Sequence, residues 1–366
     1  MEPFDVRELL QLQSVPGVGP LKLRSLITHF QTPDRVLSAT PRELHRVPGI
    51  DKHLAVTIAR HRVPDETITH QLRAVNAVGG EIISLWDERY PALLKRIYDP
   101  PTLLYTLGHP RRGDECLLAV VGTRRPSTYG EKVVRTIVRE LVEAGYGIVS
   151  GLARGIDTLA HMETLSAGGR TIGVLGSGID KPYPRENVSL MKRMLAEGAV
   201  MSEFPMGTKP DAPNFPRRNR IVSGMSVGTI VVESDVDGGA MITAATALDQ
   251  NREVFAIPGP IFEPRSIGPH TLVRDGRAKI VMSAEEILSE LPGGRVLRTR
   301  KELRGELPEL TLFERKVLDT LNEHPLHVDA IADRAAIGSA DTLVALLGLE
   351  IKKLVRQLPG KHFVVW

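Results

Sequence analysis

The feature that most constrains this chain is a series of short Val/Ile-rich runs between residues 80 and 292, most of them followed by a helical stretch. The runs are CLLAVVG (from Cys116), GIVSG (from Gly147), TIGVLG (from Thr171), AVMSEF (from Ala199), TIVVES (from Thr229) and EVFAIPG (from Glu253). A strand buried on both faces has such a continuous apolar sequence, and stretches such as EKVVRTIVRELVEAG supply the crossover helices. The pattern predicts a Rossmann-like α/β domain with a mostly parallel sheet, to which KIVMS near residue 280 adds a last strand.

A chain of 366 residues is too long for one small core, so flanking domains are expected. Residues 1–75 are predicted to form helices joined by short turns, two of which are alike: SVPGVGPLKL (Ser14 to Leu23) and RVPGIDKHLA (Arg46 to Ala55). Such turns predict a helix-hairpin-helix, or SAM-like, domain whose backbone N–H groups can hold a phosphate. Asp51 puts a negative charge in the second turn, which leaves the first as the candidate for nucleic-acid contact. Plain helix connections are the alternative for both.

The C-terminal part differs from the α/β domain in composition. Residues 293–308 have no apolar period and are expected to form a linker, and residues 309–366 are predicted to form a winged-helix domain. The expected recognition helix begins SADTLVALLGLE and offers no Arg, Asn or Gln to base edges, while Lys352, Lys353 and Arg356 come late in it. We therefore expect no reading of duplex sequence and favour a protein-interaction or auxiliary DNA role.

Composition limits the remaining chemistry. The net charge is only +3, so nucleic-acid binding would have to rest on local clusters of basic residues. There is one cysteine, Cys116, and the eleven histidines lack the spacing of metal ligands, so no internal disulfide, metal or cofactor is expected. No apolar run approaches ~18 residues and the N-terminus does not resemble a signal peptide, which predicts a cytoplasmic protein without a membrane segment.

Ligands of open parallel sheets bind at the carboxyl ends of the strands, and the segments expected there are unusual. Glycines recur where a backbone must approach a ligand closely, although each alone could serve an ordinary turn. Basic residues recur beside them: Arg124, Arg125, Arg154, Lys181, Arg185, Arg217, Arg218 and Arg220. Aromatic residues make up only 4% of the chain, yet Tyr129, Tyr183, Phe204 and Phe215 fall in the same segments. The combination predicts a phosphate-binding edge with stacking platforms, as in proteins that hold single strands without reading sequence.

The stretch NFPRRNRIVSG, Asn214 to Gly224, places three arginines close together. Pro216 is expected to prevent a regular helix there, so the stretch is predicted to be a loop. Uncompensated arginines would repel one another, and their counter-charge could be an internal carboxylate, a small phosphate ligand or a nucleic-acid backbone. Because few acidic residues fall in the same segments, we favour an external anion over internal ion pairs.

A nucleotide-binding or nucleotide-cleaving Rossmann enzyme is the alternative. GSGIDK has only two glycines of a dinucleotide fingerprint, Ser150 lacks the G-x-S-x-G context, and His161 is expected on a helix surface or behind the site. In DGGAMITA, Gly238 and Gly239 open a helix and predict an anion nest. The nucleotide phosphoribohydrolases have a similar turn followed by a catalytic glutamate, and this chain has Ala245 at that position. The pattern favours binding without catalysis.

Taken together, VGTRRPSTYG, SGLARGIDTLAH, TIGVLGSGIDKPYPRENVSL, NFPRRNRIVSGMS and VVESDVDGGAMITAATALDQNREVFAIPG resemble the DprA/Smf family, DNA-processing protein A. The resemblance covers about residues 80 to 292, in the family's order. It implies a non-enzymatic, single-stranded-DNA-binding protein of natural transformation that protects incoming strands and helps load the RecA recombinase, displacing single-strand-binding protein. It also implies a homodimer formed through the Rossmann-like domain.

The resemblance further implies a single-stranded-DNA pocket made by four parts of the chain. These are Gly122, Thr123 and Arg124; Ser150 and Gly151; Gly176 and Ser177; and Phe215, Arg218, Asn219 and Arg220. Arg217 fills a position that varies in the family. SDVDGG departs from the family's usual S-G-S, which bears on the anion contact expected at Gly238 and Gly239. The arginines are expected to bind phosphates. Phe215 is expected to stack on a base, with packing on the domain as a lid as the alternative, and Tyr183, which lies between prolines, is expected to pack.

Overall fold

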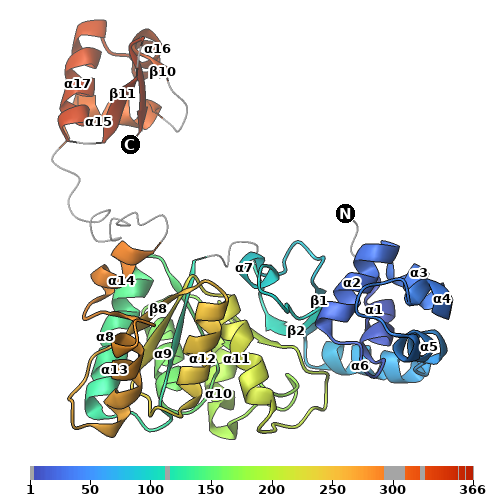
Figure 1. Cartoon of the computed structure of the whole chain (residues 1–366). Helices are drawn as coiled ribbons and strands as arrows, with labels where there is room; N and C mark the ends of the chain where they lie inside the picture. Colours follow the sequence, from blue (N-terminus) through green and yellow to red (C-terminus); the bar gives the residue numbers. More distant parts are fainter. Residues whose placement is uncertain are drawn as a thin grey trace. The chain divides into compact units, whose positions relative to one another are not determined.

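The computed structural model describes residues 4–111, 116–291, 310–321, 326–352, 354–358 and 360–365. The chain divides into two compact units, Met1–Leu297 and Arg298–Trp366, and each is described by itself. The predicted linker 293–308 and Lys353 lie outside the described residues. Figure 1 shows a sheet with helices on both faces in the first unit, and helices with a small sheet in the second.

The first unit is built on a nine-stranded sheet in the order β1-β2-β6-β5-β4-β3-β7-β8-β9. Its strands are β1 (Glu81–Ser84), β2 (Leu103–Gly108), β3 (Leu117–Gly122), β4 (Gly147–Ser150), β5 (Thr171–Val174), β6 (Ala199–Ser202), β7 (Gly228–Val232), β8 (Glu253–Ala256) and β9 (Lys279–Ile280). From β6 to β9 all neighbours are parallel, whereas β1 pairs with β2 and β2 with β6 antiparallel. The predicted Rossmann-like fold is confirmed.

Side chains of β3 alternate between two apolar layers, which is why this strand is apolar throughout. Leu118 and Val120 pack with the layer of α8 (Thr128–Glu143) and α9 (Ile156–Ser166). Leu117, Ala119 and Val121 pack with the layer of α11 (Asn214–Gly224), α12 (Gly239–Asp249) and α13 (Ile267–Arg274). The remaining elements of this region are α7 (Ala92–Lys95), α10 (Val188–Met194), α14 (Ala284–Glu290) and the short 3₁₀ turns Arg185–Asn187 and Pro264–Ser266.

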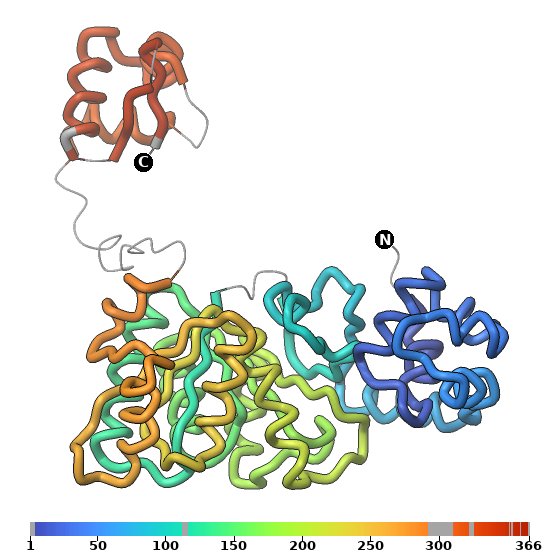
Figure 2. The backbone as a smooth tube through the Cα atoms, viewed as in Figure 1, coloured from blue at the N-terminus to red at the C-terminus, as the bar shows by residue number. Residues whose placement is uncertain are grey.

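The N-terminal helices share a core with the sheet. They are α1 (Val6–Gln13), α2 (Pro20–Phe30), α3 (Pro33–Ser38), α4 (Pro41–Leu44), α5 (Lys52–Arg60) and α6 (Asp65–Ala77). Leu9, Leu26 and Ile58 belong to the same buried cluster as Tyr105 of β2 and Val200 of β6. In Figure 2 these blue helices lie beside the cyan segment that carries β1 and β2.

The second unit contains α15 (Leu312–Thr320), α16 (Val328–Ala335) and α17 (Ser339–Ile351) with the strands β10 (Leu326–His327), β11 (Val355–Leu358) and β12 (His362–Val365). Val317, Ile331, Leu346, Val355 and Phe363 form its core. The predicted winged-helix fold is confirmed, with one correction. Arg356 lies in β11 and not in α17, because the helix ends at Ile351 with Lys352 as its C-cap. None of the helices described here combines the length and apolar composition needed to cross a membrane.

Candidate functional site

A recess of about 300 Å³ lies at the point where the strand order reverses. The chain leaves β3 for β4 on one side and returns to β7 on the other, so the loops after these strands diverge and leave a crevice. The recess is lined by Gly122, Thr123 and Arg124 after β3, Gly151 after β4, Phe215, Arg218 and Asn219 of α11, and Gly238 and Gly239 at α12. Figure 1 shows α11 and α12 next to each other on the same side of the sheet. The fold thus brings most of the predicted site residues together.

Arg124 is presented on a firmly anchored loop. Thr123 N–H donates to the carbonyl oxygen of Glu233 at 2.7 Å, and the N–H and hydroxyl of Ser127 both donate to the Glu233 carboxylate. Arg265 donates to the carbonyl oxygen of Arg125 at 3.0 Å, which fixes the middle of the loop. Arg124 itself is exposed and has no carboxylate partner among the described residues. Its guanidinium carbon lies 5.9 Å from the centroid of the Phe215 ring, within reach of a cation–π contact.

Arg218 lines the recess but is almost entirely buried. It is 5% exposed and donates to the carbonyl oxygens of Gly151 and Val174, at the ends of β4 and β5. Asp157, also buried, accepts hydrogen bonds from the N–H groups of Gly151 and Ala153 at 3.1 and 3.3 Å. Burial lowers the pKa of Arg218 to about 10, and the negative charge of Asp157 opposes this shift. Burial likewise raises the pKa of Asp157, and the positive charge of Arg218 opposes that rise. Arg218 and Asp157 therefore shape the turn after β4.

Arg220 has internal carboxylate partners. It contacts Glu203, which follows β6, and its Nε lies 3.2 Å from a carboxylate oxygen of Asp99. A guanidinium nitrogen of Arg217 lies 3.9 Å from a carboxylate oxygen of Glu203, and the guanidinium carbon of Arg217 lies 5.3 Å from the centroid of the Phe204 ring. Burial raises the pKa of Glu203, and Arg220 and then Arg217 oppose that rise. The expectation that this arginine cluster lacks internal counter-charges is wrong for Arg220 and, at the longer distance to Glu203, for Arg217.

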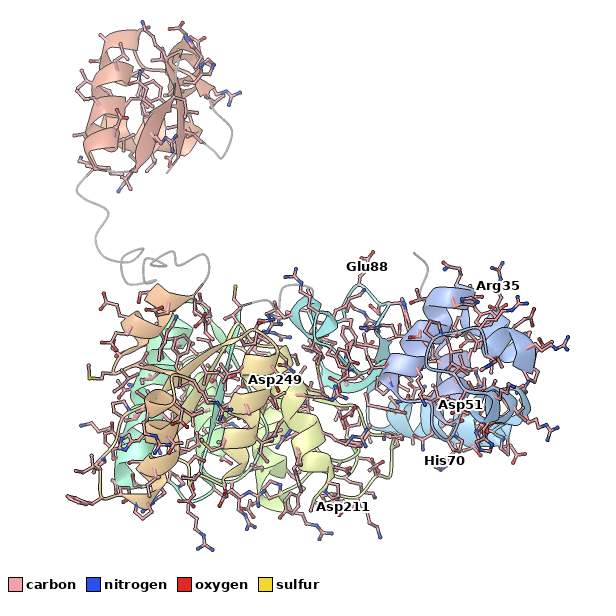
Figure 3. All side chains as sticks on the ribbon, in the orientation of Figure 1. Arg35, Asp51, His70, Glu88, Asp211 and Asp249 are labelled. Carbon is pink, nitrogen blue, oxygen red and sulfur yellow. The ribbon has the colours of Figure 1, made fainter. Side chains whose placement is uncertain are left out.

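The stretch Asn214–Gly224 is the helix α11, which corrects the expected loop. Pro216 occupies the first turn, where a missing N–H costs no intrahelical hydrogen bond. The turn before the helix, which contains the labelled Asp211 of Figure 3, is closed by the bond from Asn214 N–H to Asp211 O at 3.0 Å. Helical geometry is what separates the arginines, because it sends Arg218 and Arg220 into the protein and leaves Arg217 half exposed.

Other predicted site residues are also engaged within the protein. Arg154 contacts Glu186 through two hydrogen bonds of 2.5 and 2.8 Å, and Lys181 lies 3.7 Å from Asp180. The hydroxyl of Ser150 donates to Val120 O and that of Ser177 to Lys181 O, and both serines are buried. A side chain at Gly176 would meet the Phe215 ring. These side chains stabilise the edge through contacts within the protein, and their polar groups are therefore less available to a ligand.

The N-terminus of α12 closes the opposite side of the recess. Gly238 is its N-cap and no side chain caps the helix. Met241 N–H donates to Gly238 O at 2.9 Å, which leaves the N–H groups of Gly239 and Ala240 as the donors at this end of the helix. A side chain at Gly238 would strike Ser234, whereas the space around Gly239 is open. Asn219 donates to Gly239 O at 3.3 Å and joins α11 to this turn. The arrangement suits an anion near Gly239, with the exposed Asp235 at the rim.

The aromatic residues of the edge differ in availability. Phe215 forms a wall of the recess and lies 5.9 Å, ring to ring, from Tyr183, which is 42% exposed. Phe204 is buried, and the hydroxyl of Tyr129 donates to Pro258 O at 2.6 Å. Phe204 is therefore part of the core rather than a stacking platform.

His161 is a core residue, not a helix-surface group. It is fully buried, and its Nδ1 lies 2.6 Å from the Thr171 hydroxyl. Burial, assisted by the positive charge of Arg218, lowers the pKa of His161 to about 3. Ala245, the residue that replaces the glutamate expected of a phosphoribohydrolase, lies within α12. Within the described ranges, no group of three or more His, Cys, Asp or Glu residues is placed to hold a metal ion.

The two N-terminal hairpins have the same backbone form. Gly17 and Gly49 have φ angles of +85° and +84°, a conformation that favours glycine. In the second hairpin, Asp51, labelled in Figure 3, accepts a hydrogen bond from Leu54 N–H at 2.7 Å and so occupies a donor that a phosphate would use. In the first hairpin, Gly19 provides no such side-chain cap to α2.

Sequence reasoning missed three carboxylates that organise the site: Asp157, Glu203 and Glu233. Glu203 and Glu233 each follow directly after a strand, and their place at the carboxyl end of a strand is the sequence signal that could have identified them as residues of the site. Glu233 also has φ of +52°, which is uncommon for a residue with a side chain and often marks a functional region.

Comparisons with known proteins agree with this geometry. Residues 81–292 match the family described as DNA recombination-mediator protein A, residues 302–361 the DprA winged helix domain, and residues 9–61 a SAM-like helix-hairpin-helix tandem. Protein Smf of Synechocystis is 33% identical over 97% of this chain and 97% of its own length.

Solved structures that are similar to this chain include two of DNA processing protein A. The X-ray structure of DNA processing protein A from Streptococcus pneumoniae is 31% identical with a TM-score of 0.69, covering 79% of this chain and 99% of that one. A structure of DNA processing protein A from Helicobacter pylori, solved to study the single-stranded DNA binding mode of that protein, is 28% identical with a TM-score of 0.52. It covers 58% of this chain and 98% of that one.

Proposed function

The chain belongs to the DprA/Smf family of DNA recombination-mediator proteins, and from this premise we propose that it binds single-stranded DNA at the recess between β3, β4 and β7. One observation carries the proposal: Arg124 is exposed on an anchored loop at the mouth of the recess and has no carboxylate partner among the described residues. A guanidinium held in this way is suited to bind a phosphate through two hydrogen bonds.

The recess offers complementary groups for one nucleotide. Arg124 and the N–H groups at Gly239 are positioned for a phosphate, and Phe215 is positioned for a base. Gly122, Thr123, Gly151 and Asn219 supply the surrounding backbone and one side-chain amide. Arg218 and Arg220 support this surface from below instead of contacting the strand, because their guanidinium groups are buried and hydrogen-bonded within the protein.

The finer roles follow from family membership. We propose that the protein acts by binding and not by catalysis, protects single strands, helps load RecA onto them and works alongside single-strand-binding protein in natural transformation, in the cytoplasm. A homodimer through the Rossmann-like domain would join two binding edges. The edge strand β9 is the place we favour, because Ile280 in this strand and Met282 just after it are 54% and 73% exposed.

The alternative of a nucleotide-cleaving enzyme has less support. Asp157, a carboxylate of the recess, already accepts two backbone hydrogen bonds, and Ala245 replaces the glutamate of the phosphoribohydrolases. Titration with a mononucleotide and with an oligonucleotide separates the two functions, since an enzyme of this kind would bind and cleave the mononucleotide.

The central experiment is fluorescence anisotropy of a labelled oligo-dT and its matching duplex over a series of salt concentrations. We compare the wild type with Arg124→Ala and with Arg135→Ala, an exposed arginine on α8 outside the recess. Preference for the single strand, lost in Arg124→Ala together with a reduction of the salt slope by ~0.7, would support the proposal. Equal binding by wild type and Arg124→Ala would refute it.

A further inference from the structure

The recess between β3, β4 and β7 continues past Phe215 into a second, smaller recess of about 40 Å³. Five residues line both: Arg124, Gly151, Ala153, Phe215 and Arg218. The second recess is completed by groups that the first does not include, among them Arg154, Gly176 and Tyr183. The edge therefore has two adjacent positions with the Phe215 ring between them.

Tyr183 brings a second aromatic ring to this edge. Its ring centroid lies 5.9 Å from that of Phe215, with 48° between the ring planes. At that angle the rings do not stack face to face, and Tyr183, at 42% exposure, keeps accessible ring surface. The 40 Å³ recess has room for roughly three waters, so a base would lie against the exposed ring instead of entering the recess.

The charges around Tyr183 favour a base there over a phosphate. Arg154 is already held by both oxygens of Glu186, at 2.5 and 2.8 Å, so this guanidinium is occupied. Arg124 lines both recesses and is 5.9 Å from the Phe215 centroid, which places it beside the junction between the two positions. A phosphate at the junction would meet Arg124, with a nucleoside on either side.

We propose that Tyr183 is a second stacking residue, and that the unit recognised by this edge is a dinucleotide step of a single strand. One base stacks on Phe215, the next on Tyr183, and Arg124 binds the phosphate between them. This inference rests on the proposed function and adds to it a second subsite, whose stacking residue is one of the aromatic residues that the sequence places at this edge. A mononucleotide would fill only the first subsite.

The test pairs a ring deletion in the protein with base deletion in the ligand. Anisotropy is measured for a labelled oligo-dT and for an abasic sugar-phosphate strand of the same length and charge. The variants are Tyr183→Leu, Tyr183→Phe, Arg124→Ala and the control Tyr98→Leu, which removes a tyrosine that is 78% exposed. We expect Tyr183→Leu to weaken oligo-dT binding by about 5- to 150-fold, the range for one stacked base. It should leave abasic binding unchanged, with Tyr183→Phe and Tyr98→Leu close to wild type.

Three outcomes overturn the inference, and they are distinguishable. If Tyr183→Leu binds oligo-dT as wild type does while Arg124→Ala is weakened, the proposed function stands and the second stacking residue is wrong. If Tyr183→Leu loses affinity equally for both strands, its role is not stacking. If wild type itself does not bind oligo-dT, the proposed function fails and the inference with it. Thermal melts of all variants verify that each is folded.

Discussion

The carboxylate of Glu233, at the end of β7, accepts hydrogen bonds from both the N–H and the hydroxyl of Ser127, although the two residues are 106 positions apart in the chain. Thr123, at the other end of the same loop, donates to the Glu233 carbonyl oxygen. One buried residue thus holds both ends of the loop that carries Arg124, so the position of this arginine depends on a carboxylate that is not among the residues lining the recess.

We predict that Glu233→Ala lowers both stability and affinity for single strands. The change leaves the Ser127 N–H without its partner, which costs about 1–3 kcal/mol of unfolding free energy. The released loop no longer fixes Arg124, so affinity falls, but by no more than in Arg124→Ala. Urea unfolding and anisotropy measure the two effects, with the exposed Glu143→Ala as control. Unchanged affinity in a destabilised Glu233→Ala would show that the anchor does not matter for binding.

Arg220→Ala and Arg124→Ala should affect different properties of the protein: the first its stability, the second its binding of single strands. Arg220 is paired with the buried Glu203, and removing one partner of a buried pair costs about 3–5 kcal/mol of unfolding free energy. Arg124 is exposed, and its loss should change stability by less than ~0.5 kcal/mol while weakening binding of single strands. The midpoint of urea unfolding and the anisotropy titration separate these effects. An unchanged midpoint for Arg220→Ala would contradict the structural role assigned to it.

Much of the fold could be predicted from the sequence, because strands buried on both faces leave a simple signal. Every predicted run between Cys116 and Ile280 corresponds to a strand. The strands β1 and β2 were not predicted, since they pair antiparallel at the sheet edge and no crossover helix follows them to mark a repeat. The location of the binding edge followed from the same reasoning, because the carboxyl ends of parallel strands meet at one edge.

The roles of individual arginines could not be predicted. NFPRRNR shows three arginines, but which one meets a carboxylate depends on the direction of each side chain around α11 and on where Glu203 and Asp99 lie. These partners are 17 and 121 positions away along the chain. Pro216 led to the wrong prediction of a loop. A proline is tolerated in the first turn of a helix, and the sequence alone did not show that this helix begins at Asn214.

Stability should depend on pH through His161. Its pKa in the folded state is about 3, below the value of 6.5 expected when unfolded, so the unfolded chain binds the proton more readily between these values. The contribution of His161 is complete above pH 6.5 and is lost as the pH falls, at up to about 1.4 kcal/mol per pH unit. Urea unfolding at several pH values measures this slope. His161→Asn, which cannot titrate, should have a shallower slope between pH 6.5 and 5; an identical slope would rule out His161 as its source.

The proposed homodimer can be tested at the β9 edge. Ile280 lies in the edge strand β9 and Met282 follows it, and both are exposed. The outer backbone groups of β9 have no neighbouring strand in the sheet described. Replacing both by Asp should prevent a second copy from pairing there, since like charges would face each other across a two-fold axis. Sedimentation velocity over a concentration range is the measurement, with Ile261→Asp, at an exposed position outside β9, as control. A dimer that persists in the double variant would place the interface elsewhere.

Glu186 should weaken binding of single strands because it occupies Arg154. The two groups form a bidentate, solvent-exposed ion pair. The hydrogen bond from Arg154 holds the pKa of Glu186 below its usual range, so the pair remains charged at neutral pH. Glu186→Gln keeps the size of the side chain and removes its negative charge, which frees Arg154 and lessens repulsion of the phosphate backbone. We expect affinity for oligo-dT to rise about two- to fivefold at low salt, with a steeper salt slope. Glu143→Gln, on α8, is the matched control. If Glu186→Gln instead weakens binding, Glu186 serves to orient Arg154 toward the strand, and the ion pair is part of the binding surface instead of a competitor for it.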